Sequence, residues 1–303
     1  MSVLEGPRRE LRHIVYRGSS CWADYRDGEL HLVDGRVVPE CEVQHLAPCA
    51  PTKILCIHVN YRSRLYEFTG AAKPPSTPTY FQKPVTALNA HGGELVRPSG
   101  YQYLNYEGEV AAVIGKVTRN VTRDEVWDHI AGFAVANDVG LQDMRDTDAG
   151  SMLRVKGPDG FCPIGPGLVS GVDVRRSILR TYKNGKLVQE GAVSEMIFEI
   201  DYIIADLARH ITLLPGDLIL TGTPANSRPM EVGDLIEVEV SQLGRLGNRV
   251  VEAPAPRATV GHQPTDSESV RRVALGNDER LPPELAKLNR NGAVTDTRTR
   301  AGA

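Results

Sequence analysis

Two short segments of this sequence carry the three carboxylates best suited to chemistry. Glu107 and Glu109 are two positions apart at the start of an apolar run, and a strand there places both side chains on one face. Their Cα atoms would then lie roughly 6.6 Å apart, at about 3.3 Å per residue. Two such neighbours repel each other unless they share a cation or a proton. The spacing therefore indicates a site for a hard divalent cation.

A third carboxylate, Asp138, ends the segment 132–137, which is predicted to be a strand. Mg²⁺ is usually held by a few carboxylates and keeps positions for water and substrate oxygens. No His-rich or Cys-rich motif offers the softer ligands that zinc or copper prefers. The E-x-E spacing alone is weak evidence, because Glu237 and Glu239 repeat it in a segment predicted to face solvent. Because Asp138 is expected to lie nearby, the pair Glu107 and Glu109 is favoured as the cation site.

The elements that position these residues are predicted to be mostly strands. Segments 53–59, 132–138, 218–221 and 235–240 have strand patterns. Short helices are expected at 61–68 and from a capping box at 122–125 to about residue 130. Between residues 68 and 98 the Pro and Gly content predicts a long ordered loop or a lid.

Composition excludes several classes of function. The chain has 303 residues, and 35 Lys+Arg against 38 Asp+Glu give a net charge of −3. This charge indicates no nucleic-acid or membrane partner. No apolar run is long enough to span a bilayer, and the first residues lack the apolar segment of a signal peptide. Five cysteines without a C-x-x-C pair are typical of reduced thiols, so a cytoplasmic protein is expected.

Three regions are predicted along the chain. Residues 1–50 form a small β-rich N-terminal region with a hairpin at 31–38. Residues 51–252 form the catalytic part. Residues 253–303 are a polar, aromatic-free tail with one helix at 283–288, expected to be loosely ordered or draped on a partner and to lie outside the catalytic core.

Five motifs occur in an order and spacing that resemble the fumarylacetoacetate hydrolase family over about residues 50–252. They are Asn60-Tyr61, the run NYEGEV at 105–110, ANDV at 136–139, Lys156-Gly157 with CPIGP at 162–166, and LTGTP at 220–224. Within the family, the chain looks most similar to bacterial isomerases or decarboxylases of aromatic meta-cleavage products. Segments 146–157 and 225–229 contribute most to that likeness.

The resemblance implies an α+β, β-rich fold, a mixed β-roll or sandwich with few short helices, assembled as a homodimer. It implies one Mg²⁺ (or Mn²⁺) per site and a small oxo-acid as the substrate. The family's functional residues fall on the following positions of this sequence: metal ligands on Glu107, Glu109 and Asp138, an active-site lysine on Lys156, and substrate contacts on Tyr61, Lys83, Gly222 and Thr223.

The sequence departs from the family pattern at two places. Many members carry N-Y-x-x-H-x-x-E; here Glu67 is present, but Arg64 occupies the histidine position. A guanidinium stays protonated and cannot act as a base, but it can bind a second carboxylate. Gln142 replaces a frequent arginine, and Arg145 is expected to take its place. Arg64 therefore favours a dicarboxylate substrate over hydrolysis by activated water.

The predicted function is isomerisation or decarboxylation of an unsaturated 2-oxo dicarboxylate from aromatic catabolism. The metal ion would act as a Lewis acid on the keto oxygen and stabilise an enolate. Lys156 or Glu67 would transfer the proton. One alternative is hydrolysis of a C–C bond in an acylpyruvate or fumarylpyruvate type of diketo acid. Another is a family member without catalytic activity.

Other polar residues are given structural interpretations. His58 is predicted to be a hydrogen-bonded core histidine and Cys162 a buried apolar group. His91, in the long loop, is an alternative base. Three aspartates, Asp143, Asp146 and Asp148, are predicted to form a solvated turn rather than a second cation site.

Overall fold

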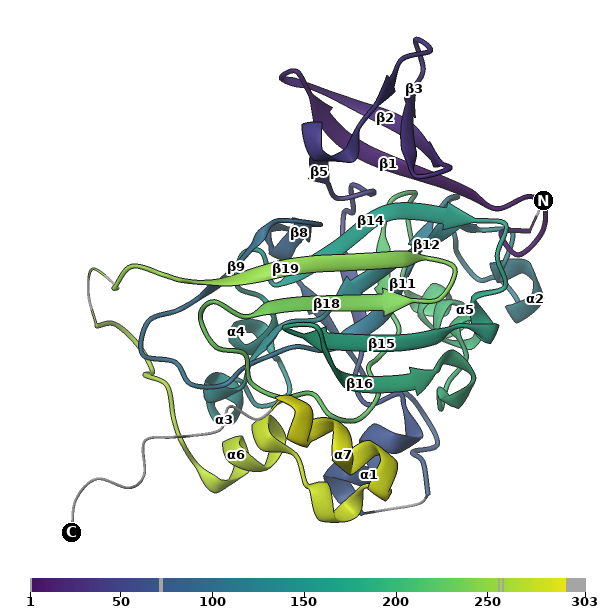
Figure 1. Cartoon of the computed structure of the whole chain (residues 1–303). Coiled ribbons are helices and arrows are strands. Elements are labelled where there is room, and N and C mark those ends of the chain that lie inside the picture. Colours follow the sequence, from purple (N-terminus) through teal and green to yellow (C-terminus); the bar gives the residue numbers. More distant parts are fainter. Residues whose placement is uncertain (1, 71–72, 256, 258, 293–303) are drawn as a thin grey trace.

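Two β-sheets packed face to face make up most of the molecule. The computed structural model describes residues 2–70, 73–255, 257 and 259–292 (Figure 1). Mixed sheets dominate and the helices are few and short, as predicted from the sequence. Among the described residues, no helix is long and apolar enough to cross a membrane.

The larger sheet has 12 strands and runs from the N-terminal region into the centre of the molecule. Its order is β4-β3-β2-β1-β14-β12-β11-β17-β6-β7, with β5 paired to β1 and β8 to β14. The N-terminal strands are β1 (Arg9–Tyr16), β2 (Ser19–Arg26), β3 (Glu29–Leu32), β4 (Val37–Val38) and β5 (Gln44–Leu46). The central strands are β6 (Ile54–Ile57), β7 (Tyr80–Lys83), β8 (Leu88–Ala90), β11 (Gly108–Ile114), β12 (Ile130–Asn137), β14 (Cys162–Ser170) and β17 (Leu218–Leu220).

The smaller sheet has five strands in the order β16-β15-β18-β19-β9. These are β9 (Glu94–Arg97), β15 (Ile178–Lys183), β16 (Lys186–Ala192), β18 (Leu235–Val240) and β19 (Gly244–Glu252). Strands β11, β12 and β14 pack against β15, β18 and β19. A separate two-stranded sheet pairs β10 (Leu104–Asn105) with β13 (Gly140–Leu141).

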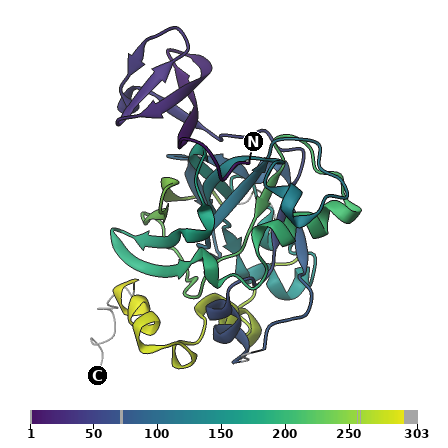
Figure 2. The same ribbon diagram turned by 90° about the vertical axis from the view of Figure 1, so that its right-hand side faces the viewer.

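Short helices lie mainly at one end of the sheets. Figures 1 and 2 show the N-terminal strands of the larger sheet at one end of the molecule and the C-terminal helices at the other. The α-helices are α1 (Arg62–Thr69), α2 (Arg123–Val126), α3 (Arg145–Asp148), α4 (Leu153–Lys156), α5 (Ile200–His210), α6 (Glu268–Leu275) and α7 (Pro283–Gly292). The 3₁₀ helices are η1 (Glu40–Glu42), η2 (Val85–Ala87), η3 (Gln142–Met144), η4 (Val174–Arg176), η5 (Val193–Glu195) and η6 (Asp278–Arg280).

Strand β11 is buried on both faces and separates two parts of the core. Val110 and Ala112 pack with the smaller sheet and α5, whereas Ala111 and Val113 face a second apolar cluster. Because side chains alternate along a strand, Glu109 lies on the face of Ala111 and Val113. The two-residue period read from the sequence is confirmed here.

The prediction of a long loop between residues 68 and 98 is wrong from residue 80 onward. This stretch contains β7, β8 and β9. β8 pairs in parallel with β14 and β9 in parallel with β19, which are far away in the sequence. Strands of three or four residues held by distant partners leave almost no local pattern, so the Pro and Gly content dominated the prediction.

The C-terminal segment also differs from its prediction. The helix expected at 283–288 is present as α7, but α6 was missed. Ser267 caps α6 by accepting a hydrogen bond from the amide of Val270, and the helix buries Val270 and Val273. The segment is therefore an ordered part of the molecule as far as residue 292.

Asp217 joins the start of β6 to the turn before β17. Its buried carboxylate accepts hydrogen bonds from the amides of Thr52 (2.9 Å), Lys53 (3.1 Å) and Leu214 (2.7 Å), and it pairs with Lys53 Nζ at 2.5 Å. Burial alone would raise the pKa of Asp217, but the bonds from Leu214, Lys53 and Thr52 outweigh it and lower the pKa.

We expect Asp217→Ala to lower the free energy of unfolding by about 3 kcal/mol, because it leaves several buried donors unpaired. Denaturant titration at pH 7 measures this. Since the folded pKa lies below the unfolded value, the contribution is present above about pH 4 and is lost as the pH falls through the folded pKa. Asp34→Ala, which removes an exposed turn aspartate paired with Arg36, is the control and should change stability much less. Equal losses in both variants would contradict the prediction.

Candidate active site

The three carboxylates predicted from the sequence come together at the ends of two paired strands. One oxygen from each of Glu107, Glu109 and Asp138 lies within 4.8 Å of the other two. The antiparallel register of β11 and β12 pairs Gly108 with Asn137 and so brings the flanking residues together. The amide of Asp138 also donates to the carbonyl of Glu107 at 2.8 Å.

Glu109 is the carboxylate with the least compensation for its charge. It is 2 % exposed, and its Oε2 accepts a hydrogen bond of 2.6 Å from the amide of Gly222. Burial, and then the charges of Asp138 and Glu107, hold its pKa well above the usual range. Three converging carboxylate oxygens are the donors that Mg²⁺ and Mn²⁺ prefer, so these residues fit a hard divalent cation.

Lys156, at the end of α4, contacts two of the three carboxylates. Its Nζ lies 2.6 Å from Glu107 Oε2 and 2.9 Å from Asp138 Oδ2, and it donates to the carbonyl of Asp138 at 2.7 Å. Burial would lower the pKa of Lys156, but the charges of Asp138 and Glu107 outweigh it and raise the pKa. The side chain is therefore an ammonium at neutral pH.

Lys83, on β7, is a second buried cation at the cluster. Its Nζ lies 2.5 Å from Asp138 Oδ1 and donates to the carbonyl of Val139 at 3.2 Å. Burial raises the pKa of Asp138, but the charges of Lys156 and Lys83 outweigh this and lower it. Asp138 is thus the carboxylate held ionised by the protein itself.

Arg64 on α1 also contacts the cluster, at Glu107. One guanidinium nitrogen lies 2.6 Å from Glu67 Oε2 and the other 3.5 Å from Glu107 Oε1. Glu67 also pairs with Arg228 at 2.7 Å, and its side chain has no exposed surface. Between two guanidinium groups, Glu67 orients Arg64 and is poorly placed to accept a substrate proton.

A small cavity of about 50 Å³ opens beside the carboxylates. Since about 10–15 Å³ is the least space that holds one water molecule, the cavity has room for only a few. Its lining includes these residues predicted from the sequence: Arg64, Glu107, Glu109, Asp138, Arg145, Lys156 and Thr223. The five other predicted site residues do not line the cavity; Lys83 and Glu67 are buried beside the lining residues with which they pair. Tyr61 is buried in the core, Gln142 is buried beside Gly140, and Gly222 supports Glu109 through its amide.

His58 lines the same cavity, so its interpretation as a core histidine is wrong. The ring is half-buried and lies 4.8 Å from the ring of Phe81, which is also at the cavity. Burial, followed by the charges of Arg145 and Lys156, lowers the pKa of His58, which keeps the ring neutral at pH 7. Its position one residue past the end of β6 was visible in the sequence, but its direction was not.

The solvated turn predicted for Asp143, Asp146 and Asp148 is wrong for two of them, because Asp143 and Asp148 are buried and only Asp146 is exposed. Asp143 accepts hydrogen bonds from the amides of Gln102 and Tyr103 at 2.8 Å each. Asp148 pairs with Arg154 at 2.6 Å. These bonds hold η3, α3 and α4 in place and so fix the position of Lys156.

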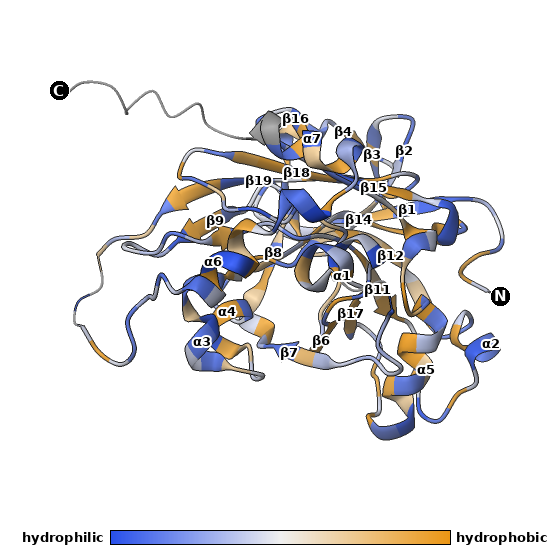
Figure 3. Ribbon diagram, turned by 90° about the horizontal axis from the view of Figure 1, so that it is seen from below, coloured by the Kyte–Doolittle hydropathy of each residue, from blue (hydrophilic) through white to orange (hydrophobic). Residues whose placement is uncertain are grey.

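The described C-terminal segment covers the site, which corrects the prediction that it lies outside the catalytic core. Val273 of α6 lines the cavity, and the nearby carbonyl of Ala274 accepts a bond of 2.8 Å from Asn105. Figure 3 shows α6 next to α3, on the side of the molecule where α1 also lies. Further bonds are Tyr103 to Asp266 (2.7 Å), Arg228 to Asp278 (2.9 Å), Arg280 to the carbonyl of Phe68 (2.6 Å) and Asn226 to the carbonyl of Leu285 (2.8 Å).

Comparison with known proteins agrees with this fold. Residues 53–251 match the model of the fumarylacetoacetate (FAA) hydrolase C-terminal family, which is most of the chain. The chain therefore belongs to the fumarylacetoacetate hydrolase family.

Two relatives and one solved structure with named activities are similar to this chain. The chain is 37% identical over 201 residues to a 4-hydroxyphenylacetate degradation bifunctional isomerase/decarboxylase of Salmonella dublin, covering 65% of this chain and 46% of that protein. It is 34% identical over 227 residues to human mitochondrial oxaloacetate tautomerase FAHD2A, covering 71% and 72%. The structure of 5-carboxymethyl-2-hydroxymuconate delta-isomerase from Mycobacterium smegmatis superposes with a TM-score of 0.75 at 32% identity, covering 81% and 99%.

Proposed function

We propose that this protein is a divalent-metal-dependent enzyme that isomerises or decarboxylates an unsaturated 2-oxo dicarboxylate from aromatic catabolism. The observation that carries the proposal is the cluster of Glu107, Glu109 and Asp138, with the ammonium of Lys156 and the guanidinium of Arg64 both in contact with Glu107. The similarity to isomerases and to a bifunctional isomerase/decarboxylase supports the class of reaction.

In this proposal the carboxylates bind the metal ion, and the cationic side chains act on the substrate. Glu107, Glu109 and Asp138 would hold Mg²⁺ or Mn²⁺, which when bound supplies Lewis-acid activation of a 2-oxo acid. Lys156 would deliver a proton to the carbon chain, and Arg64 would bind the distal carboxylate. His58, a neutral ring at the cavity, is a further acceptor for the proton, and α6 would exclude water. A homodimer stays a prediction.

The proposal is tested by an ultraviolet assay of the metal-loaded protein with a panel of oxo acids, followed by identification of the products. We expect Mn²⁺- or Mg²⁺-dependent loss of the conjugated absorbance of oxo-heptenedioates. Turnover of an acylpyruvate to pyruvate, with no reaction of the dioates, would favour hydrolysis and contradict the proposal.

A second candidate is tautomerisation of a four-carbon 2-oxo diacid. The cavity of about 50 Å³ is small, which favours a short diacid over a longer one. The relative named oxaloacetate tautomerase supports this reading. Including oxaloacetate in the panel separates the two candidates, because tautomerisation consumes the enol form without loss of carbon dioxide.

Arg64→Ala should raise KM for a dicarboxylate at least about tenfold more than KM for its monocarboxylate analogue, because the bidentate partner of the second carboxylate is lost. Steady-state kinetics with both substrates measure the difference. Arg62→Ala, on the exposed side of the same helix, is the control and should change neither value. Equal effects of Arg64→Ala on the two substrates would show that Arg64 does not bind the second carboxylate.

Val273→Phe should raise KM for the substrate at least about tenfold, since the larger side chain fills a cavity with room for only a few waters. Leu275→Phe is the matched control, because Leu275 is on the same helix and 44% exposed. Thermal unfolding of both variants shows whether the fold is retained. A KM unchanged by Val273→Phe would place the substrate away from α6.

A further inference from the structure

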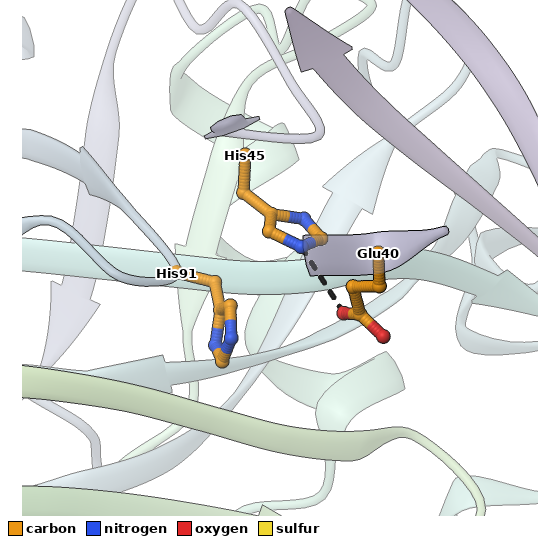
Figure 4. Close-up of side chains that lie close together, drawn as sticks. All are labelled: Glu40, His45 and His91. Atoms are coloured by element: carbon orange, nitrogen blue, oxygen red, sulfur yellow. Dashed lines mark ion pairs between the residues drawn. The ribbon is translucent and has the colours of Figure 1, made fainter. Parts of the chain in front are cut away.

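A second group of metal-ligand side chains lies where the N-terminal region meets the central sheet, away from the carboxylate cluster. It consists of Glu40 in η1, His45 on β5 and His91 at the turn after β8. One donor atom from each lies within 4.8 Å of the other two. Figure 4 shows the three side chains close together, with His45 and Glu40 joined by an ion pair.

His45 is the least satisfied member of this group. Its ring is 8% exposed, and among the described residues neither ring nitrogen makes a hydrogen bond. Nε2 lies 3.1 Å from Oε1 of Glu40 as an ion-pair contact. Its backbone is held in register with Ile14 of β1. Burying an imidazole without hydrogen bonds costs free energy of desolvation. A metal ion bound to the lone pair of the ring would offset this cost.

His91 is held by the neighbouring strand β19. The amide of Gly92 donates to the carbonyl of Gly247 at 2.9 Å, and the amide of Gly247 donates to Nδ1 of His91 at 3.0 Å. In the neutral ring the proton is therefore on Nε2. Coordination through Nε2 requires the other tautomer, so the ring must turn away from the amide of Gly247 and this hydrogen bond is lost.

Arg12 is the competing cation for Glu40, with which it forms an ion pair through Oε1. Arg12 also pairs with Glu10 at 2.8 Å and lies over the ring of Tyr25, 3.4 Å from its centroid. These two contacts remain if Glu40 turns to a metal ion. Arg12 therefore lowers the affinity of the site for a metal ion, but its own guanidinium stays paired when the metal ion binds.

We propose that Glu40, His45 and His91 form a Zn²⁺ site that joins the N-terminal region to the catalytic sheet. Two imidazoles and one carboxylate are a ligand set typical of zinc, unlike the all-oxygen set at Glu109. The 3.1 Å separation of His45 and Glu40 is close to the roughly 3.3 Å between ligands of a tetrahedral zinc ion with bonds of 2.0–2.1 Å. All three side chains line a cavity of about 800 Å³, from which water would supply the fourth ligand.

The site is tested by Zn²⁺ titration of the full chain carrying Glu109→Gln, which weakens the carboxylate site, after chelator treatment. We expect one tightly bound Zn²⁺ per chain. Adding His91→Ala should weaken binding by at least about 100-fold, because one of three protein ligands is lost. Adding His13→Ala, which removes another half-buried histidine of the N-terminal region, should leave binding unchanged. Two results would overturn the proposal. One is equal Zn²⁺ binding by the His91→Ala and His13→Ala variants, and the other is less than one Zn²⁺ per chain in the protein carrying Glu109→Gln alone.

A second measurement needs no variant and covers the case in which a substitution disturbs folding. Long-range nitrogen–proton NMR of the histidine rings should show His45 and His91 shifting with one equivalent of Zn²⁺. For His91 the proton should move from Nε2 to Nδ1. Unchanged spectra of both rings at saturating Zn²⁺ would also overturn the proposal.

Discussion

Glu109→Gln should lower kcat/KM by at least about 10³-fold, equivalent to about 4 kcal/mol, and weaken Mn²⁺ binding by a comparable factor. The substitution keeps the shape of the side chain and removes the charge that a cation needs. Because burial and two neighbouring carboxylates disfavour that charge, the metal-free variant should be at least as stable as the metal-free parent. Activity and metal affinity therefore fall while stability does not.

Calorimetric titration with Mn²⁺, steady-state kinetics and thermal unfolding measure these three effects. Glu237→Gln is the matched control, since Glu237 and Glu239 have the same E-x-E spacing on β18. Glu237 is half-exposed and lies 3.5 Å from Arg245. It should leave metal affinity and turnover unchanged. If Glu109→Gln retains the metal affinity and the turnover of the parent, the carboxylate cluster does not hold the metal.

Lys156→Met should lower kcat by about 10²–10⁴-fold, the usual contribution of a general acid or base, with a smaller change in KM. Its ammonium contacts Glu107 and Asp138, the same carboxylates that a metal ion would use. Removing that competitor should leave Mn²⁺ affinity unchanged or higher. A loss of turnover with unimpaired metal binding distinguishes proton transfer from a damaged metal site.

Lys183→Met is the control for loss of a buried lysine. Lys183 is 8% exposed and pairs with Asp234 at 3.0 Å on the smaller sheet. We expect it to lower stability and to leave kcat unchanged. A similar loss of kcat in both variants would indicate that the effect of Lys156→Met is structural.

The carboxylate cluster was predictable because its signal is local. Glu107 and Glu109 share a strand face by the two-residue period, and Asp138 directly follows a buried strand. The order of motifs along the chain was enough to recognise the family, and through it Lys156 and Lys83. The positions of Arg64 and Glu67 on α1 were also expected, although their mutual ion pair was not.

Tertiary contacts decided the rest. The sequence by itself determined the β-rich fold, the acidic cluster and the absence of the usual lid histidine. Only the folded chain showed that His58 faces the cavity, that Glu67 is bound between two guanidinium groups, and that Val273 covers the site. The same holds for His45 and His91, which are 46 positions apart yet share a cluster with Glu40. Periodicity reports which face of an element is apolar, whereas long-range pairing decides which faces meet, and no local pattern records it.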